Sequence, residues 1–241
     1  MISHALNQNT DRSDIQIRHK GFADYFSTWQ AMKDFTASRT RSARDEIWLL
    51  QHPPVYTQGI AGRPEHLLYN AGIPVIRTDR GGQITYHGPG QIVAYLLLDI
   101  RRLRLGVREL VRKMEGAVVD LLQDYHIGAE GCTDAPGVYV DGAKIAALGL
   151  KIRNSCCYHG LALNVDMDLT PFAAINPCGY PGLRVTQTRD LGVADGLETL
   201  SIKLSEKLQA RLLSTSEPIC KSLTKPLAES LAEPLIESVT E

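Results

Sequence analysis

The segment 176–183, NPCGYPGL, carries the side chain of this sequence that is best suited to covalent chemistry, the thiol of Cys178. Prolines and glycines on both sides disfavour a helix or a central strand, so Cys178 is expected in a loop. Structural cysteines usually pack inside strands and helices, whereas loops on a rigid scaffold often carry catalytic groups. This segment alone leaves two interpretations open, a free cysteine in a turn and a nucleophile.

A second segment with chemical potential is DRGGQITYHGPGQ at 79–91. Paired glycines allow positive φ angles or a close approach of the backbone to a ligand, and such loops can present N–H groups to a carbonyl oxygen. Arg80, Tyr86 and His87 beside the glycines favour a binding site. The alternative is structural, with two turns around a short strand over 83–87.

Lys144 begins the apolar run KIAALGL, directly after the Asp-Gly pair at 141–142. A lysine here is either an edge residue in solvent or a buried amine, and a charged amine lowers the pKa of a neighbouring thiol. The spacing does not place Lys144 beside Cys178. His87 and His159 are alternative bases, although a single histidine is more often a hydrogen-bonded core residue.

The elements that must position these groups alternate between strand and helix patterns. Asp-Gly at 141–142 predicts a hairpin over 137–154 with positive φ angles at its turn. The pattern indicates an α/β or α+β fold, a single domain whose mixed β-sheet is flanked by helices. Strands are predicted at 14–21, 46–52, 73–79, 91–100 and 159–169, and helices at 23–40, 106–125 and 196–213. We expect one stripe at helical spacing to pack in the core rather than to form a cofactor site: Phe22, Tyr25, Phe26, Trp29, Met32 and Phe35.

Composition narrows the function classes. A chain of 241 residues with 44% hydrophobic residues and a net charge of −1 suits a globular domain that binds neither nucleic acid nor an anionic membrane. No apolar run could span a bilayer and the first residues resemble no targeting signal, so we expect a cytoplasmic protein. The five cysteines form no CxxC pair and no zinc-finger spacing, which predicts free thiols and no metal site. No phosphate-binding loop motif is present.

Three regions are predicted along the chain. Residues 1–13 form a flexible N-terminus, 14–213 a catalytic domain and 214–241 a tail. The tail contains the near-repeat SLTKPLAE and SLAEPLIE, and each copy carries a proline that interrupts a helix. We expect the tail to be mobile or loosely docked and to lie outside the site.

Together these segments resemble the lipoyl(octanoyl) transferases. RGGQITYHGPGQ (80–91) is similar to their glycine-rich signature, and DGAKIAALGLKIR (141–153) to the segment with their catalytic lysine. CYHGLALNVDMDL (157–169) and INPCGYPGL (175–183) are similar to the stretches that lead to their nucleophilic cysteine. Each motif is weak alone, but the four in the family's order, within a similarity over about 15–212, are specific. Ala147 and Cys157 stand where many relatives carry serine.

The resemblance implies a domain like the catalytic domains of lipoate and biotin ligases, acting as a monomer without a cofactor. The implied donor is octanoyl-acyl carrier protein. The implied acceptor is a lysine of the lipoyl domains of 2-oxoacid dehydrogenase complexes or of the glycine-cleavage carrier protein. It makes Cys178 the acyl-thioester nucleophile and Lys144 the partner that lowers its pKa. The implied substrate-binding residues are Arg80, Gly81, Gly82, Gln83, Ile84, Thr85, Tyr86, His87, Ala147, Leu148, Gly149, Gly160, Leu161 and Ala162.

Alternatives to this activity stay open at this point. One is an ATP-dependent lipoate ligase of the same fold, another a cysteine thioester hydrolase that uses Cys178 with His87 or His159, and a third a non-catalytic module that binds the carrier. The basic segment RRLRLGVRELVRK (101–113) is expected to help dock an acidic donor carrier. Its alternative is an ordinary solvated helix face.

Overall fold

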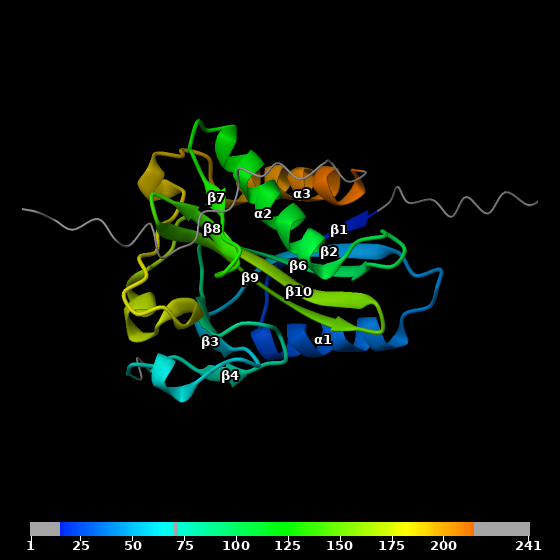
Figure 1. Cartoon of the computed structure of the whole chain (residues 1–241), viewed down its shortest axis with the longest axis horizontal. Coiled ribbons are helices and arrows are strands. Elements are labelled where there is room, and N and C mark those ends of the chain that lie inside the picture. The colour runs from blue at the N-terminus through cyan, green and yellow to red at the C-terminus, as the bar shows by residue number, and fades with distance from the viewer. Residues whose placement is uncertain (1–14, 70–71, 215–241) are drawn as a thin grey trace, which may run out of the picture.

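The computed structural model describes residues 15–69 and 72–214, and its largest element is a seven-stranded sheet (Figure 1). The strand order is β1-β2-β6-β10-β9-β8-β7. β1 and β2 run parallel and the other neighbours antiparallel, so the predicted mixed sheet is confirmed. The strands are β1 (Ile15–Phe22), β2 (Asp45–Gln51), β6 (Gln91–Asp99), β7 (Glu130–Gly131), β8 (Gly137–Val140), β9 (Ala143–Arg153) and β10 (Cys156–Asn164).

A smaller sheet lies below the large one in the view of Figure 1. Its middle strand β3 (Val55–Gln58) pairs in parallel with β4 (Val75–Arg77) and antiparallel with β5 (Ile84–His87). β4 is shorter and more exposed than the strand predicted over 73–79. β3 is absent from the sequence prediction because the two prolines before it end the preceding strand pattern.

Helices cover both faces of the large sheet (Figure 1). α1 (Tyr25–Ser38) lies on one face, and α2 (Val107–Gln123) and α3 (Leu197–Leu213) pack together on the other. The main core lies between these two helices and the sheet, and it contains Leu96 and Leu98 of β6. The helix predicted over 196–213 is confirmed as α3, with four of its leucines buried and the first only partly buried.

The aromatic stripe near α1 reaches the core only in part. Tyr25 and Met32 are buried and Trp29 is half-buried, as expected. Phe22 and Phe26 were expected in the core, but they are 60% and 52% exposed. Phe22 ends β1 instead of entering the helix. Phe26 is rotated by about 100° from Tyr25, because consecutive helical residues point in different directions.

The hairpin that carries Lys144 has the predicted geometry. β8 and β9 are joined at Asp141 and Gly142, whose φ angles are +48° and +73°. β9 then continues into β10 through Asn154 and Ser155, which also have positive φ angles. β10 begins before the predicted strand over 159–169 and ends earlier, at Asn164.

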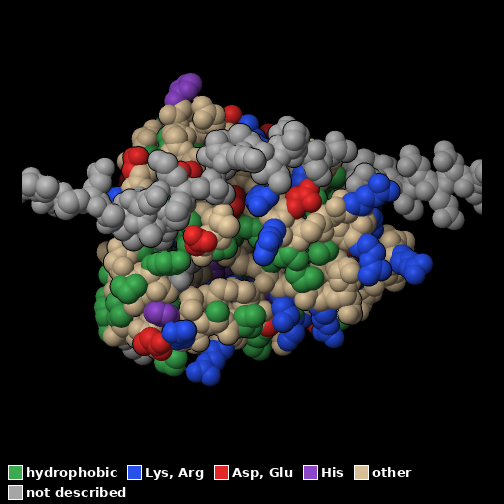
Figure 2. All heavy atoms as spheres, in the orientation of Figure 1, with side chains coloured by type: hydrophobic (Ala, Val, Ile, Leu, Met, Phe, Trp, Pro, Cys, Tyr) green, Lys and Arg blue, Asp and Glu red, His purple; other side chains and the backbone are tan. Residues whose placement is uncertain are grey.

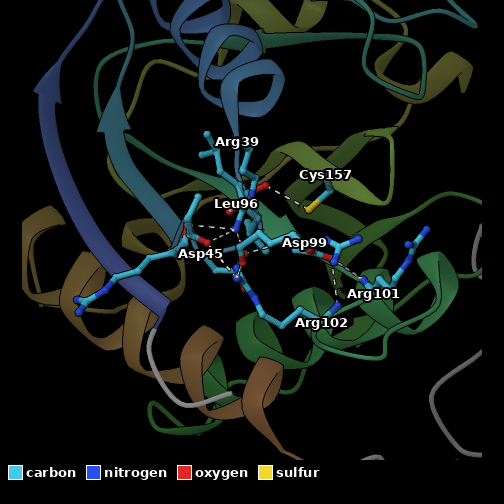
Figure 3. A network of polar contacts seen from close by, with 11 residues as sticks. Arg39, Asp45, Leu96, Asp99, Arg101, Arg102 and Cys157 are labelled. Carbon is cyan, nitrogen blue, oxygen red and sulfur yellow. Dashed lines mark hydrogen bonds and ion pairs between the residues drawn. The ribbon is translucent and has the colours of Figure 1, made fainter. Parts of the chain in front are cut away.

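A buried ionic network ties the end of α1 to β2 and β6 (Figure 3). The carboxylate of Asp45 pairs with Arg39 and, at 2.7 Å, with Arg102, and it accepts the backbone N–H of Asp99 at 2.7 Å. Lys113 is also buried, with Nζ 2.7 Å from the carbonyl oxygen of Arg211. The segment 101–113 is therefore not uniformly solvated, because two of its six basic side chains hold the fold together.

Cys157 lies beside this network and donates its thiol hydrogen to the carbonyl oxygen of Leu96, at 3.2 Å (Figure 3). Burial raises the pKa of Cys157 to about 12. Its thiol is therefore a packing group and not a reactive one.

Among the residues described, no helix combines the length and the apolar character that crossing a bilayer requires. The predicted flexible residues 1–13 and, apart from Ser214, the predicted tail lie outside the described residues. The domain boundaries stay predictions.

Candidate active site

The glycine loop (79–83), which precedes β5, is organised by the buried side chain of Arg80. Its guanidinium donates to the hydroxyl oxygen of Thr57 and to the carbonyl oxygens of Gly81 and Gln83, the last two both at 2.9 Å. Gly82 adopts a φ of +86°, which side chains rarely tolerate. One planar cation thus fixes several backbone groups of the loop.

Close backbone contacts join the glycine loop to the large sheet. The N–H of Gly81 donates to the carbonyl oxygen of Leu150 in β9, at 2.8 Å. A Cβ on Gly149 would lie 3.0 Å from the carbonyl oxygen of Gly81. In the neighbouring strand, a Cβ on Gly160 would lie only 2.0 Å from the carbonyl oxygen of Ala94. Gly149 therefore allows the glycine loop to lie close to β9, and Gly160 allows β10 to lie close to β6.

These segments surround one cavity, which holds about 480 Å³ of empty space with its open mouth included. In Figure 2 a hollow opens near the middle of the face, where Figure 1 places β9 and β10 above β3. All of the predicted substrate-binding residues line this cavity except Gly81 and Tyr86. Tyr86 points to the other face of β5 and packs on Tyr56 and Phe172.

Four further lining residues were not among the predicted binding residues. They are Tyr25 from α1, Val93 and Tyr95 from β6, and His159 from β10. The two tyrosines stood in segments that the sequence pattern marked as core. His159 was considered only as an alternative base. Residue types gave no signal here, because a wall of a cavity and a core face have the same hydrophobic pattern.

Two buried histidines are neutral near pH 7: His87, which lines the cavity, and His52, whose ring centre lies 5.9 Å from that of His87. Burial lowers the pKa of His87 to about 3, and its ring nitrogens contact Gln91 at 2.8 Å and Thr57 at 3.3 Å. Burial likewise lowers the pKa of His52 to about 4, and its Nε2 lies 2.7 Å from the hydroxyl of Tyr95. Both rings are poor bases, since an efficient general base has a pKa near the working pH.

His159 is held by Asp79. Its Nε2 lies 3.1 Å from Oδ1 of Asp79. Oδ1 also accepts a hydrogen bond from Trp29, and Oδ2 accepts one from Tyr158. Although burial raises it, these hydrogen bonds hold the pKa of Asp79 well below its ordinary value. Burial lowers the pKa of His159 in spite of this carboxylate. The arrangement favours a neutral imidazole in one fixed orientation.

Lys144 is a buried amine and not an edge residue, with 3% of its surface exposed. Its backbone N–H donates to the carbonyl oxygen of Arg184 at 2.8 Å, and its carbonyl oxygen accepts the N–H of Thr186 at 3.0 Å. Nζ lies 3.4 Å from the carbonyl oxygen of Pro136 and 5.1 Å from the centre of the Tyr139 ring. These contacts fix the amine at the start of β9.

The cysteine loop (176–186) lies close to the glycine loop and to the start of β9, where Lys144 lies. The backbone of Cys178 lies in a short 3₁₀ turn, Pro177–Gly179, anchored where the N–H of Asn176 donates to the carbonyl oxygen of His66. A Cβ on Gly179 would lie 3.3 Å from the side chain of Gln83. The side chain of Cys178 lies outside what the structure describes, so its distance from Lys144 stays a prediction.

Within residues 15–69 and 72–214, no group of three or more His, Cys, Asp or Glu side chains is arranged to hold a metal ion. Cys132 and Cys157 are buried free thiols and Cys156 is a half-buried one. The described part of the site thus offers a buried amine whose backbone is bonded to the cysteine loop, and an apolar cavity lined in part by the glycine loop. Among the residues that the structure describes, neither Lys144 nor those of the cysteine loop line the cavity.

Comparison with known sequences identifies the family. The model of the lipoyl protein ligase A/B catalytic domain matches residues 24–208. A protein of Nitrosospira multiformis named octanoyltransferase is 75% identical over 200 residues, which cover 83% of this chain and 93% of that protein. Another octanoyltransferase, from Chromobacterium violaceum, is 60% identical over 201 residues, which cover 83% and 97%.

Solved structures share the fold at much lower identity. Lipoate-protein ligase A bound with ATP has a TM-score of 0.70 at 17% identity, over 90% of this chain and 92% of that one. Biotin protein ligase from Aquifex aeolicus has a TM-score of 0.51 at 11% identity, over 82% and 68%. The predicted fold class, a mixed-sheet domain of the lipoate and biotin ligase type, is confirmed. With the family model and the sequence relatives in agreement, the chain belongs to the lipoyl protein ligase A/B catalytic-domain family and, within it, to the octanoyltransferases, which are acyltransferases.

Proposed function

We propose that this chain transfers octanoyl groups from octanoyl-acyl carrier protein to a lysine of lipoyl domains, through a thioester on Cys178 that Lys144 assists. The acceptors are the lipoyl domains of 2-oxoacid dehydrogenase complexes and the glycine-cleavage carrier protein, so the reaction begins endogenous protein lipoylation. The observation that carries the proposal is the buried amine of Lys144, whose backbone is hydrogen-bonded to the cysteine loop. A cation close to a thiol favours the thiolate.

In the first step the thiolate of Cys178 attacks the carbonyl carbon of the octanoyl thioester. A new C–S bond forms, the bond to the carrier breaks, and the carrier thiol leaves with the proton of Lys144. One thioester replaces another, so the exchange is close to energy-neutral and needs no ATP. The acyl-enzyme keeps the octanoyl group activated for a second step.

In the second step the neutral amine of the acceptor lysine attacks the thioester. Lys144, neutral after the first step, takes the proton that the amine loses when it becomes an amide. The thiolate of Cys178 leaves, and the ammonium–thiolate pair is restored. We expect backbone N–H groups of the glycine loop other than that of Gly81, which is bonded to Leu150, to stabilise the oxyanion that forms in each step.

The cavity provides the apolar surroundings that an octanoyl chain needs, with Val93, Tyr95 and Ala162 among its lining. Burial of roughly six methylenes at ~0.8 kcal/mol each contributes about 5 kcal/mol to binding. One methylene more or less changes the preference by ~1–3 kcal/mol. We therefore expect weak activity on neighbouring chain lengths.

The site disfavours two of the alternatives. A hydrolase that uses His87 or His159 needs a basic imidazole, but burial lowers the pKa of both rings. An ATP-dependent ligase shares the fold, as the ATP-bound neighbour illustrates, but the sequence relatives at 60–75% identity are named octanoyltransferases. The two activities differ in their need for Cys178, because the proposed transfer passes through a thioester on this residue and a ligase does not require it.

The test is the intact mass of the protein after mixing with octanoyl-acyl carrier protein in the absence of acceptor. We expect wild type to gain one octanoyl group that hydroxylamine removes, and a lipoyl domain to discharge it. Cys178→Ala should gain nothing. Cys156→Ala is the matched control, because it removes a half-buried free thiol elsewhere and should leave the adduct intact.

Other outcomes identify the alternatives. A protein that gains no mass but modifies a lipoyl domain with ATP and free octanoate is a ligase. Release of free octanoate without acceptor indicates a hydrolase. Binding of the carrier with no adduct and no product indicates a binding module. Any of these results overturns the proposed transfer.

A further inference from the structure

One peptide group lies between two buried ionisable side chains. The N–H of Gly137 donates to Oε1 of Glu115 at 3.0 Å, and the carbonyl oxygen of Pro136 accepts from Nζ of Lys144 at 3.4 Å. These two groups belong to the same peptide bond. Glu115 is 8% exposed and Lys144 is 3% exposed. A carboxylate of α2 therefore contacts one end of a peptide dipole whose other end contacts the amine.

Two glycines make this arrangement possible. A Cβ on Gly137 would lie 3.0 Å from Nζ of Lys144 and 2.8 Å from the carbonyl oxygen of Ala146. A Cβ on Gly131 would lie 2.9 Å from Oε2 of Glu115. Side chains at either position would push the carboxylate or the amine away from the shared peptide.

The charges around Glu115 allow it to titrate near neutral pH. Burial raises the pKa of Glu115 to about 7, while the N–H of Gly137 and the positive charges of Lys144 and Arg112 lower it. The elements packed on this part of α2 carry further titratable groups, namely Glu130 of β7, Tyr139 of β8 and Arg211 of α3, which is paired with Asp120. Lys144 and Arg112 are thus the cations whose charges lower the pKa of Glu115, and Lys144 is the one that shares a peptide group with it.

We propose that Glu115 is a positioning residue that holds the proton on Lys144 through the peptide between residues 136 and 137. The inference rests on the proposed function, in which Lys144 is charged during acylation and neutral during discharge. A carboxylate bonded to the N–H end of this peptide stabilises positive charge at the carbonyl end, where the amine lies. In the acyl-enzyme the thiolate of Cys178 is consumed, and an ionised Glu115 then favours the return of a proton from solvent to the neutral Lys144.

The two half-reactions respond in opposite directions to this carboxylate. An ionised Glu115 favours the ammonium–thiolate pair and so speeds acylation, because its charge acts on the Lys144 end of the pair. The same charge keeps Lys144 protonated in the acyl-enzyme and slows discharge to the acceptor lysine. A defect in folding or packing slows both steps, so the opposition is specific to the charge.

The experiment measures the two half-reactions separately from pH 6 to pH 9 in wild type and Glu115→Gln. Gln keeps the acceptor for the Gly137 N–H and removes the charge. We expect acylation by octanoyl-acyl carrier protein to slow several-fold. The pH profile of discharge to a lipoyl domain should move down by about one pH unit, the size expected for charges separated by one peptide group. The two proteins should converge as the pH approaches 6, where most of the Glu115 of wild type is protonated.

Controls separate this inference from the proposed function. Glu46→Gln removes another buried carboxylate and should change neither profile. Glu46 lies on β2 and is hydrogen-bonded to Arg18 of β1 and to Trp48. An absent Cys178 adduct in wild type, or a Lys144→Met protein with the wild-type discharge profile, contradicts the proposed function itself. Suppose instead that wild type forms the Cys178 adduct and that Lys144→Met alters the discharge profile. Equal profiles for wild type and Glu115→Gln, or slowing of both steps in Glu115→Gln, then overturn the role of Glu115 alone.

A second measurement does not require a change at Glu115. The amide of Gly137 is bonded to the carboxylate, so its NMR shift reports the protonation of Glu115. We expect a midpoint near pH 7 in wild type and about one unit higher in Lys144→Met, because coupling between two sites is reciprocal. The same midpoint in both proteins contradicts the inference.

Discussion

Lys144 and Val185 form a parallel β-bridge that joins the strand of the buried amine to the loop of Cys178. Both main-chain groups of Lys144 are bonded there, to Arg184 and to Thr186. The backbone of Lys144 cannot shift relative to the cysteine loop without breaking two hydrogen bonds. The register of this bridge therefore determines how the amine and the loop meet.

Thr186→Pro removes the N–H that donates to the carbonyl oxygen of Lys144. We expect kcat for octanoyl transfer to fall roughly 10- to 100-fold with little change in the donor KM, because a misplacement of about 1 Å costs that much in rate. Thr186→Ala keeps the N–H and serves as control. Equal kcat values for the two variants would show that the bridge does not position Lys144.

Ala162 lines the cavity from β10, and a larger side chain there should shorten the space for an acyl chain. For Ala162→Val we expect kcat/KM to shift by about tenfold in favour of hexanoyl over octanoyl donors. Leu163 points to the opposite face of β10, into the main core. Leu163→Val should therefore lower stability and leave the chain-length preference unchanged; if it shifts the preference equally, the cavity is not the acyl site.

Stability should fall on mild acidification because of His52 and His87. Burial lowers their pKa values to about 4 and 3, below the ~6.5 of an unfolded chain. Between pH 6.5 and pH 4 the unfolded state binds more protons, so the free energy of unfolding decreases as pH falls, by up to about 1.4 kcal/mol per pH unit for each ring. Urea denaturation at pH 7 and pH 5 should show a smaller loss for His87→Asn than for wild type. Equal losses would rule out a contribution from His87.

Asp45→Asn should destabilise the fold and spare the chemistry. The change leaves Arg39 and Arg102 without their shared carboxylate (Figure 3), which typically costs about 3–5 kcal/mol for a buried pair. Urea denaturation measures the loss, and kcat of the folded fraction should match wild type. Asp34→Asn, an exposed change on α1, should alter neither quantity.

Donor docking should depend on the exposed part of the segment 101–113. Arg102 and Lys113 are tied to the fold, whereas Arg101, Arg104 and Arg108 are exposed. Reversal of these three exposed charges to Glu should raise the KM for octanoyl-acyl carrier protein about tenfold and flatten its dependence on salt. The KM for the lipoyl-domain acceptor is the control. An unchanged donor KM would assign these charges to ordinary solvation.

Local patterns in the sequence were sufficient for most elements. Alternation and helical spacing predict the central strands and all three helices, and the Asp-Gly pair at 141–142 predicts the hairpin turn. The resemblance to a known family named three quarters of the residues that line the cavity. These successes share a cause, because each depends on residues that are neighbours in sequence or on a motif of fixed spacing.

The remaining features depend on which elements meet in space. The alternation in β6 does not reveal that Tyr95 faces a cavity. The pattern of α2 does not reveal that Glu115 bonds the same peptide group as Lys144. Likewise, no local signal predicts that Lys113 turns inward to bond the end of α3. Strand order and helix packing decide these contacts, and neither can be read from periodicity.

The bridge between Lys144 and Val185 also bears on how the chain folds. It joins positions about forty residues apart, and the bond from Asn176 to His66 joins positions 110 apart. Contacts between such distant residues form late, because loop-closure entropy must be overcome first. A growing or half-folded chain therefore lacks the contacts that hold the amine and the cysteine loop together. The capacity to carry an acyl group should therefore appear last in refolding, after the rest of the domain has folded.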